Sequence, residues 1–144
     1  MVAASDLIGA WHLADWAIEY SDGRPTTYPF GEQPDGQLMY SADGRMSGTI
    51  CRRQRQRMSN ENVRQAPMAE KAAAFDSYFH YAGTWRIDGD QVIHTVEQSL
   101  NPNFVGTDQI RDMDYSGDQL ILSARQRTAS GAEMHNKLVW RRVG

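Results

Sequence analysis

The chain has 144 residues, a net charge of −3 and one cysteine, Cys51. This length fits one domain spanning residues 1–144, because two domains of half the size would each bury too little apolar surface. The negative charge argues against nucleic-acid binding, which depends on Lys and Arg neutralising phosphates. No apolar run reaches the roughly 18 residues that a membrane-spanning helix needs, so no membrane association is expected. A lone cysteine forms no internal disulfide and no signal peptide is evident, so we expect a cytoplasmic protein.

Turn signals divide the chain into short segments at fairly even intervals. Dipeptides such as Asp43-Gly44 and Asp88-Gly89 mark tight turns, because glycine adopts the positive φ angles that hairpins require. The segments between the turns have the residue types of strands. They comprise residues 11–20, 37–41, 45–51, 84–88, 91–99, 107–115, 119–126 and 136–143. About eight or more short strands separated by turns predict an all-β sandwich or antiparallel barrel.

One segment, residues 67–82, has a helical pattern instead. Its apolar residues recur at spacings of three and four and form a single stripe, made of Met68, Ala72, Phe75 and Phe79. Pro67 suits the first position of a helix, and Gly83 suits the residue just past its end. A lone amphipathic helix must bury its stripe. We therefore expect a helix over about 67–82 that covers one open end of the barrel.

The segment before this helix is rich in arginine. Residues 51–57 carry four arginines, of which Arg53, Arg55 and Arg57 would share one face of a strand. We interpret them as a charged strand end that protects an exposed edge. Their charge is expected to lower the pKa of Cys51. Residues 54–66 are predicted to form a long loop, either a binding lid or a plain surface loop.

Six stretches of the chain carry a resemblance to a known family. They are Leu7–Trp11, Tyr28–Glu32, Gly36–Met46, Ala74–Gly83, Val92–Glu97 and Asn101–Arg111. In this order they resemble the lipocalin-like domain family of small bacterial and fungal proteins. The resemblance implies a lipocalin-like antiparallel β-barrel whose interior has room for a ligand. Related barrels include binders of small apolar molecules and cofactor-free enzymes that isomerise or cyclise natural-product intermediates.

The start of the first strand, Gly9-Ala10-Trp11, also resembles the lipocalin signature. In that signature a tryptophan closes the bottom of the barrel beneath an arginine from the last strand. The resemblance implies that Arg141 or Arg142 lies over Trp11 in a cation–π contact. This chain departs from the family at Thr95, where a second histidine often follows the first, and that departure weakens any case for a metal site.

The strand predicted near residues 108–115 has one acidic face. Asp108, Asp112 and Asp114 share it, and burying three carboxylates together would be prohibitive, so that face should point to water. The opposite face, with Gln109, Arg111 and Met113, then points inward. A buried arginine stays charged and needs a partner, which makes Arg111 the strongest single site candidate.

The preceding strand offers partners for Arg111. Its two faces, one carrying His94 and the other Glu97, are both half apolar, so alternation alone does not decide which points inward. Either residue would neighbour Arg111, and a β-bulge would allow both to do so. A Glu–Arg pair there would be a structural ion pair or part of a catalytic site.

Two functions follow from this interior. The first is a barrel that binds a small apolar or aromatic molecule. The second is a cofactor-independent isomerase, lyase or cyclase, with His94 or Glu97 as general base or acid and Arg111 donating hydrogen bonds to a carbonyl or enolate. The residues expected to contact the ligand are Trp16, Tyr40, Phe75, Tyr78, Phe104, Gln109 and Met113, with Tyr81 as a further cavity wall or proton donor. The four histidines lack metal-ligand spacing, so neither a metal nor a cofactor is expected, and the protein is expected to be a monomer or homodimer.

Overall fold

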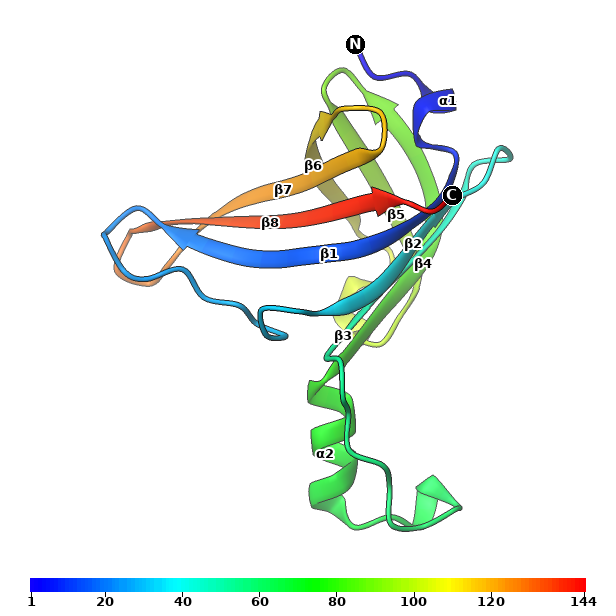
Figure 1. Cartoon of the computed structure of the whole chain (residues 1–144), viewed down its shortest axis with the longest axis vertical. Helices are drawn as coiled ribbons and strands as arrows, with labels where there is room; N and C mark the ends of the chain where they lie inside the picture. The colour runs from blue at the N-terminus through cyan, green and yellow to red at the C-terminus, as the bar shows by residue number, and fades with distance from the viewer.

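A computed structural model describes residues 1–144. Eight antiparallel strands close into one barrel, and each strand pairs with its neighbours in chain order (Figure 1). The strands are β1 (Gly9–Tyr20), β2 (Asp35–Tyr40), β3 (Arg45–Cys51), β4 (Tyr78–Asp88), β5 (Gln91–Ser99), β6 (Asp108–Tyr115), β7 (Gln119–Arg127) and β8 (Glu133–Arg142). The helical elements are α1 (Ala4–Leu7), η1 (Val63–Gln65), α2 (Met68–Asp76) and η2 (Pro102–Phe104). The all-β antiparallel barrel expected from the sequence is confirmed.

One end of the barrel is closed by Trp11, which is 0% exposed. Its indole Nε1 donates to the Leu7 carbonyl at 2.9 Å, so α1 is tied across this end. The Arg142 guanidinium lies 4.2 Å from the centre of the Trp11 ring, and it also donates to the Ile8 carbonyl. The predicted cation–π contact is present, and Arg142 rather than Arg141 makes it.

The hydrophobic core occupies this closed end. Alternate residues of β2 point inward and are buried, as a strand with one solvent-facing side requires. The buried side chains that pack together are Leu7, Trp11, Leu13, Leu38, Tyr40, Met46, Val92, Leu120, Leu122 and Trp140. They come from α1 and from β1, β2, β3, β5, β7 and β8, so the closed end is held from nearly every side of the barrel.

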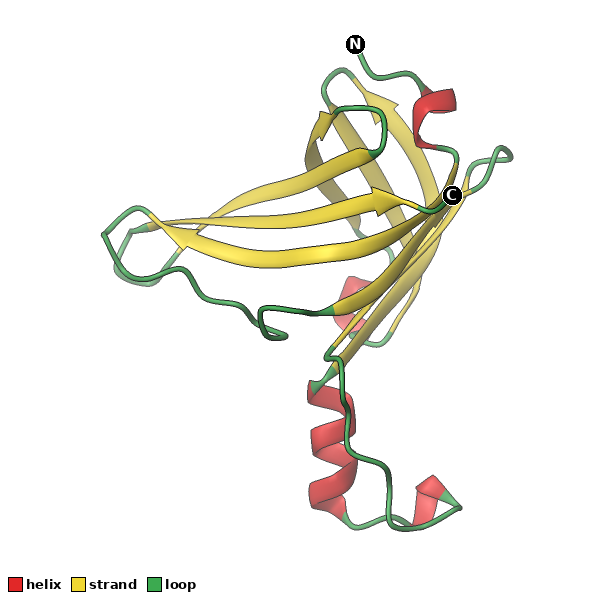
Figure 2. Cartoon of the chain, in the orientation of Figure 1, coloured by secondary structure: helices red, strands yellow, loops and turns green.

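The predicted helix is shorter than expected and does not cover the open end. It ends at Asp76, and residues 78–82 belong to β4, where they pair with β3 and β5. Figures 1 and 2 show α2 extending away from the barrel, with Met68 80% exposed and Phe75 54% exposed. The expectation was wrong because residues 78–82 all pair with β3, and Tyr81 and Ala82 also pair with β5; this pairing outweighs a helical apolar spacing.

A β-bulge lies between β4 and β5. Gly83 pairs with Val96 while Ala82 pairs with Gln98, so Glu97 is the extra residue on β5. The backbone approaches closely here, because a Cβ on Gly83 would lie 1.9 Å from the Thr95 carbonyl oxygen. Only glycine fits this position, and the extra residue Glu97 is exposed to solvent.

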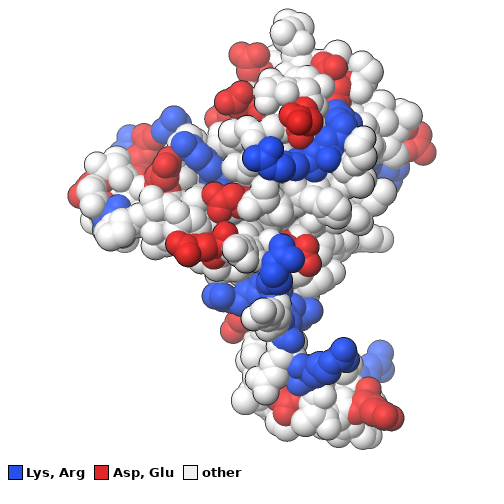
Figure 3. Space-filling model, in the orientation of Figure 1, with Lys and Arg blue, Asp and Glu red and all other residues white.

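The arginine-rich segment forms loop rather than strand, because β3 ends at Cys51. Arg53 donates to the Gln33 carbonyl and so ties this segment to the loop before β2. Arg55 donates to the Ala74 carbonyl and so ties the segment to α2. Figure 3 shows basic side chains gathered where the barrel meets α2. The expected lowering of the Cys51 pKa was wrong: burial raises the pKa of this thiol, and Asp35 adds to the rise.

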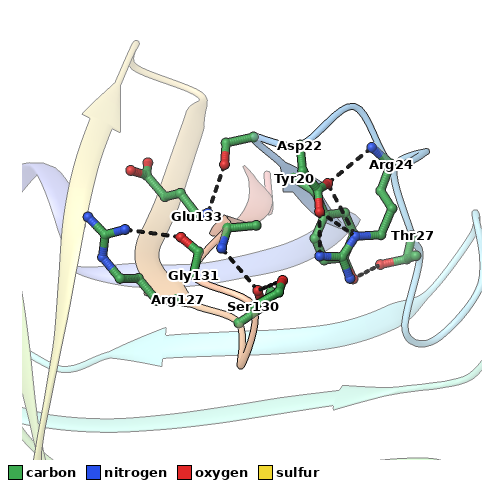
Figure 4. A network of polar contacts seen from close by, with 11 residues as sticks. Tyr20, Asp22, Arg24, Thr27, Arg127, Ser130, Gly131 and Glu133 are labelled. Carbon is green, nitrogen blue, oxygen red and sulfur yellow. Dashed lines mark hydrogen bonds and ion pairs between the residues drawn. The ribbon is translucent and has the colours of Figure 1, made fainter.

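Polar contacts hold the loops at the far end of β1 and β8 (Figure 4). Arg24 donates to the Asp22 carboxylate and lies 4.5 Å from the centre of the Tyr20 ring. The Glu133 backbone N–H donates to the Ser21 hydroxyl at 2.8 Å, which links the loop after β1 to the turn before β8. These contacts fix part of the rim of the open end, which leads to the barrel interior.

Candidate functional site

A cavity of about 620 Å³ occupies the half of the barrel that the core leaves open. Twenty-one residues line it, and 14 of them are hydrophobic. The lining residues are Trp16, Phe30, Leu38, Gly48, Ile50, Phe75, Asp76, Tyr78, Phe79, Tyr81, His94, Leu100, Asn101, Phe104, Arg111, Leu122, Ala124, Gln126, Asn136, Leu138 and Trp140. A volume of this size suits one small organic molecule.

Two groups of aromatic side chains form much of the wall. Trp16 meets Phe30 edge to face at 5.0 Å between ring centres, and its Nε1 donates to Asn136 at 2.8 Å. Phe79 contacts Phe104 at 5.6 Å, again with steeply inclined rings. Such pairs hold rings at fixed angles, so the cavity presents flat apolar surfaces suited to a planar ligand.

A buried polar group lies at the inner end of the cavity, next to the core. His94, 2% exposed, stands between two tyrosine hydroxyls. The Tyr40 hydroxyl lies 2.7 Å from Nε2, and the Tyr81 hydroxyl lies 2.6 Å from Nδ1. Both ring nitrogens are therefore hydrogen-bonded, as a buried imidazole requires. His94 and Tyr81 line the cavity, while Tyr40 belongs to the core behind them.

The surroundings of His94 keep it neutral. Burial lowers its pKa to about 3, and the nearby positive charge of Arg111 acts in the same direction. Burial also raises the pKa of the Tyr40 and Tyr81 hydroxyls. At neutral pH all three groups are therefore uncharged, and Arg111 carries the charge of this inner end.

Arg111 points into the barrel, as the alternation of β6 predicts. Asp108, Asp112 and Asp114 are exposed, and the residues between them are half-buried. The Arg111 guanidinium donates to the Gln109 side chain at 3.2 Å and to the Ile110 carbonyl at 2.9 Å. None of the ion pairs of the chain includes Arg111. Its charge thus lacks a carboxylate partner, so the Glu–Arg pair that the sequence allowed does not form.

Glu97 does not reach this site. It lies on the outer surface, where its carboxylate pairs with Arg45 at 2.7 Å. His94 faces inward, so plain alternation along β5 puts Glu97 on the outer face, and the bulge does not bring it inward. The prediction that Glu97 could neighbour Arg111 is wrong for this reason, and His94 is the inward-facing candidate of the two.

The remaining sequence candidates divide into two sets. Four of them line the cavity: Trp16, Phe75, Tyr78 and Phe104. Three do not, since Tyr40 bonds His94, Gln109 holds Arg111, and Met113 packs against the core. Sequence reasoning missed wall residues such as Phe30, Phe79 and Leu138. Strand alternation places Leu138 beside Trp140 on one face of β8, whereas Phe30 lies in a loop and gives no such signal.

No three His, Cys, Asp or Glu side chains come together in a way that would hold a metal ion. No helix is both long enough and apolar enough to cross a membrane.

The low pKa of His94 predicts how stability depends on pH. The unfolded chain binds a proton on this residue near pH 6.5, whereas the folded protein does so only near about 3. The stabilisation is therefore complete above pH 6.5 and is lost as the pH falls toward about 3. We expect a loss of about 2 kcal/mol at about pH 5, measured by urea unfolding across this range.

Two variants separate His94 from the other titrating groups. His94→Gln should be less stable at neutral pH but should lose this part of the pH dependence. His135→Gln should retain the part due to His94 and lose only the contribution of His135, whose pKa is also lowered by partial burial and by the charge of Arg125. Equal pH profiles for the wild type and His94→Gln would contradict a neutral, buried His94.

Comparison with known proteins agrees with this architecture. The model of a family described as "Lipocalin-like domain" matches residues 8–143. The "4'-hydroxy-3'-methoxypropiophenone carrier protein ppsC" of Aspergillus oryzae is 35% identical over 83 residues, which cover 51% of this chain and 75% of that protein. The chain therefore belongs to the lipocalin-like domain family.

Proposed function

We propose that this barrel binds one small, mainly apolar aromatic molecule in its cavity. The observation that carries the proposal is the cavity itself, about 620 Å³ in volume and lined by 14 hydrophobic residues among 21. Sites for small molecules have this size, an apolar lining and a few placed polar groups. A relative named as the carrier of an aromatic ketone supports a ligand of the same kind.

The arrangement of polar groups favours binding over catalysis. A general base works best when its pKa lies near the operating pH, and the pKa of His94 is about 3. Glu97, the other candidate base, lies outside the barrel. Acid–base catalysis as an isomerase, lyase or cyclase would have to use His94 with its low pKa together with Arg111 and Tyr81, which makes it the weaker alternative.

Titration with 4'-hydroxy-3'-methoxypropiophenone tests the proposal. Trp16 and Trp140 line the cavity, so their fluorescence reports on its occupation. We expect saturable quenching with one molecule bound per chain. Arg111→Met should weaken binding about 10-fold, since it removes a charged hydrogen-bond donor. Arg125→Met is the matched control, because Arg125 lies on the outer surface of β7, paired with Glu133.

Two outcomes would count against the proposal. Quenching that never saturates would indicate adsorption to the surface rather than binding in the cavity. Equal affinities for the wild type and a folded Arg111→Met variant would show that the inward arginine takes no part in binding.

A further inference from the structure

The neutral His94 can hold its proton on only one ring nitrogen, so one of its two tyrosine partners is a hydrogen-bond donor and the other is an acceptor. A neutral imidazole has one donor and one acceptor. One tyrosine therefore donates its proton to His94, and the other accepts a proton from it. The hydroxyl that accepts keeps its own O–H free for another partner.

Burial decides which tyrosine donates. Tyr40 is 2% exposed, and its hydroxyl has no hydrogen-bond partner other than His94 Nε2. If Tyr40 accepted from His94, its own O–H would be buried without an acceptor, which is strongly unfavourable. Tyr40 therefore donates to Nε2, and His94 donates from Nδ1 to the Tyr81 hydroxyl oxygen. The Tyr81 proton is then left free, and Tyr81 lines the cavity.

The other polar groups at the inner end are donors too. Arg111 uses two of its N–H groups within β6, on Gln109 and on a backbone carbonyl, which leaves further N–H groups without a partner. The indole nitrogen of Trp140, which also lines the cavity, is a buried donor with no hydrogen-bond partner. No carboxylate balances the charge of Arg111. A ligand that satisfies this end must supply an acceptor oxygen.

We propose that Tyr81 and Arg111 donate hydrogen bonds to an acceptor oxygen conjugated to an aromatic ring, such as the carbonyl of an aryl ketone, and that Tyr40 and His94 direct the Tyr81 proton toward it. The inference rests on the proposed function and specifies the chemistry of its ligand. The ring lies among the aromatic walls and the oxygen reaches the inner end. Tyr40 is a positioning residue in this arrangement, because it acts on the ligand through His94 and Tyr81.

The proton order is tested on the free protein, with no ligand. Nitrogen-15 NMR of histidine-labelled protein distinguishes a protonated ring nitrogen from an unprotonated one. We expect His94 with Nδ1 protonated and Nε2 unprotonated in the wild type. In Tyr40→Phe, which removes the donor to Nε2, this preference should weaken or disappear. A wild-type His94 protonated on Nε2 would overturn the proposed order.

The ligand chemistry is tested with two matched probes. Propiophenone and propylbenzene have the same ring and chain length, and only the first has an acceptor oxygen. We expect the wild type to bind propiophenone about 5- to 100-fold more tightly, the effect of two hydrogen bonds. Tyr81→Phe should reduce this preference, and Tyr81→Phe combined with Arg111→Met should remove it. Tyr78→Phe should keep it, because Tyr78 lines the cavity but makes no hydrogen bond to His94.

These measurements distinguish the proposed chemistry of the ligand from the proposed binding of any aromatic molecule in the cavity. Equal affinity of the wild type for both probes would overturn the assignment of an acceptor oxygen while leaving the aromatic cavity intact. A preference that is undiminished in Tyr81→Phe would remove Tyr81 from the site. Failure of both probes to bind would count against the proposed function itself, and the NMR result on the free protein would still decide the proton order.

Discussion

Replacing Ala124 with tryptophan is expected to abolish binding of a one-ring aromatic molecule. Ala124 lines the cavity from β7, on the same face of the strand as Leu122. An indole projecting from this position would occupy the space that the ligand needs. We expect the affinity for 4'-hydroxy-3'-methoxypropiophenone to fall by at least about 100-fold, equivalent to about 2.7 kcal/mol. Because the added ring enters open volume rather than packed core, the variant should fold normally.

The neighbouring residue provides the control. Ser123 lies on the outer face of β7, where its neighbours across the sheet are Asp112 and Lys137. Ser123→Trp adds the same side chain one residue away, outside the barrel, and should bind the molecule like the wild type. Full binding by a folded Ala124→Trp variant would mean that the ligand occupies some other part of the protein.

The largest expected loss of stability comes from Trp11→Ala. This side chain is fully buried, donates to the Leu7 carbonyl and lies beneath Arg142. Removing it leaves a void in the closed end and frees α1, so we expect a loss of about 3–5 kcal/mol in the free energy of unfolding. Chemical denaturation with an unchanged m-value would measure this loss directly.

Phe75→Ala is the matched control for this variant. It also deletes a large aromatic side chain, but Phe75 is 54% exposed near the end of α2. Its unfolding free energy should change by less than about 1 kcal/mol. If the two variants were equally destabilised, the closed end would not be the main source of stability in the barrel.

The sequence predicts which face of a strand points into the barrel when the two faces differ in charge. β6 carries three aspartates on one face, and the cost of burying them is enough to place Arg111 inside. β5 lacks this contrast, because apolar residues occur on both of its faces. Alternation shows that His94 and Glu97 face opposite ways, but which of them faces inward follows only from the pairing of β5 in the closed barrel. The bulge opposite Gly83 likewise arises from pairing between strands, and alternation contains no information about it.

The helix shows a second limit of sequence reasoning. Phe75 and Phe79 have helical spacing, yet Phe79 and Tyr81 also alternate as cavity-facing residues of a strand. Both patterns are present in residues 74–83, and local propensity does not choose between them. The choice comes from β3, which pairs with β4 as far as Tyr78. Tertiary pairing therefore sets the end of α2.

The polar group at the inner end is the part least accessible from the sequence. Tyr40 and His94 are 54 residues apart, and they meet because β2 and β5 place them on the inside of one closed barrel. The sequence indicates Tyr40 and His94 as candidate site residues, along with Arg111. Their contacts and their burial, which decides the direction of each hydrogen bond, follow only from the closed structure.

If an aromatic molecule binds inside the barrel, NMR will place it there. Isotope-filtered NOE spectra of the labelled protein with unlabelled propiophenone report which side chains contact the ligand ring. We expect contacts with Phe79, Phe104 and Leu138, all of which line the cavity. Contacts confined to exposed residues such as Met68 and Val63, outside the barrel, would contradict binding inside it.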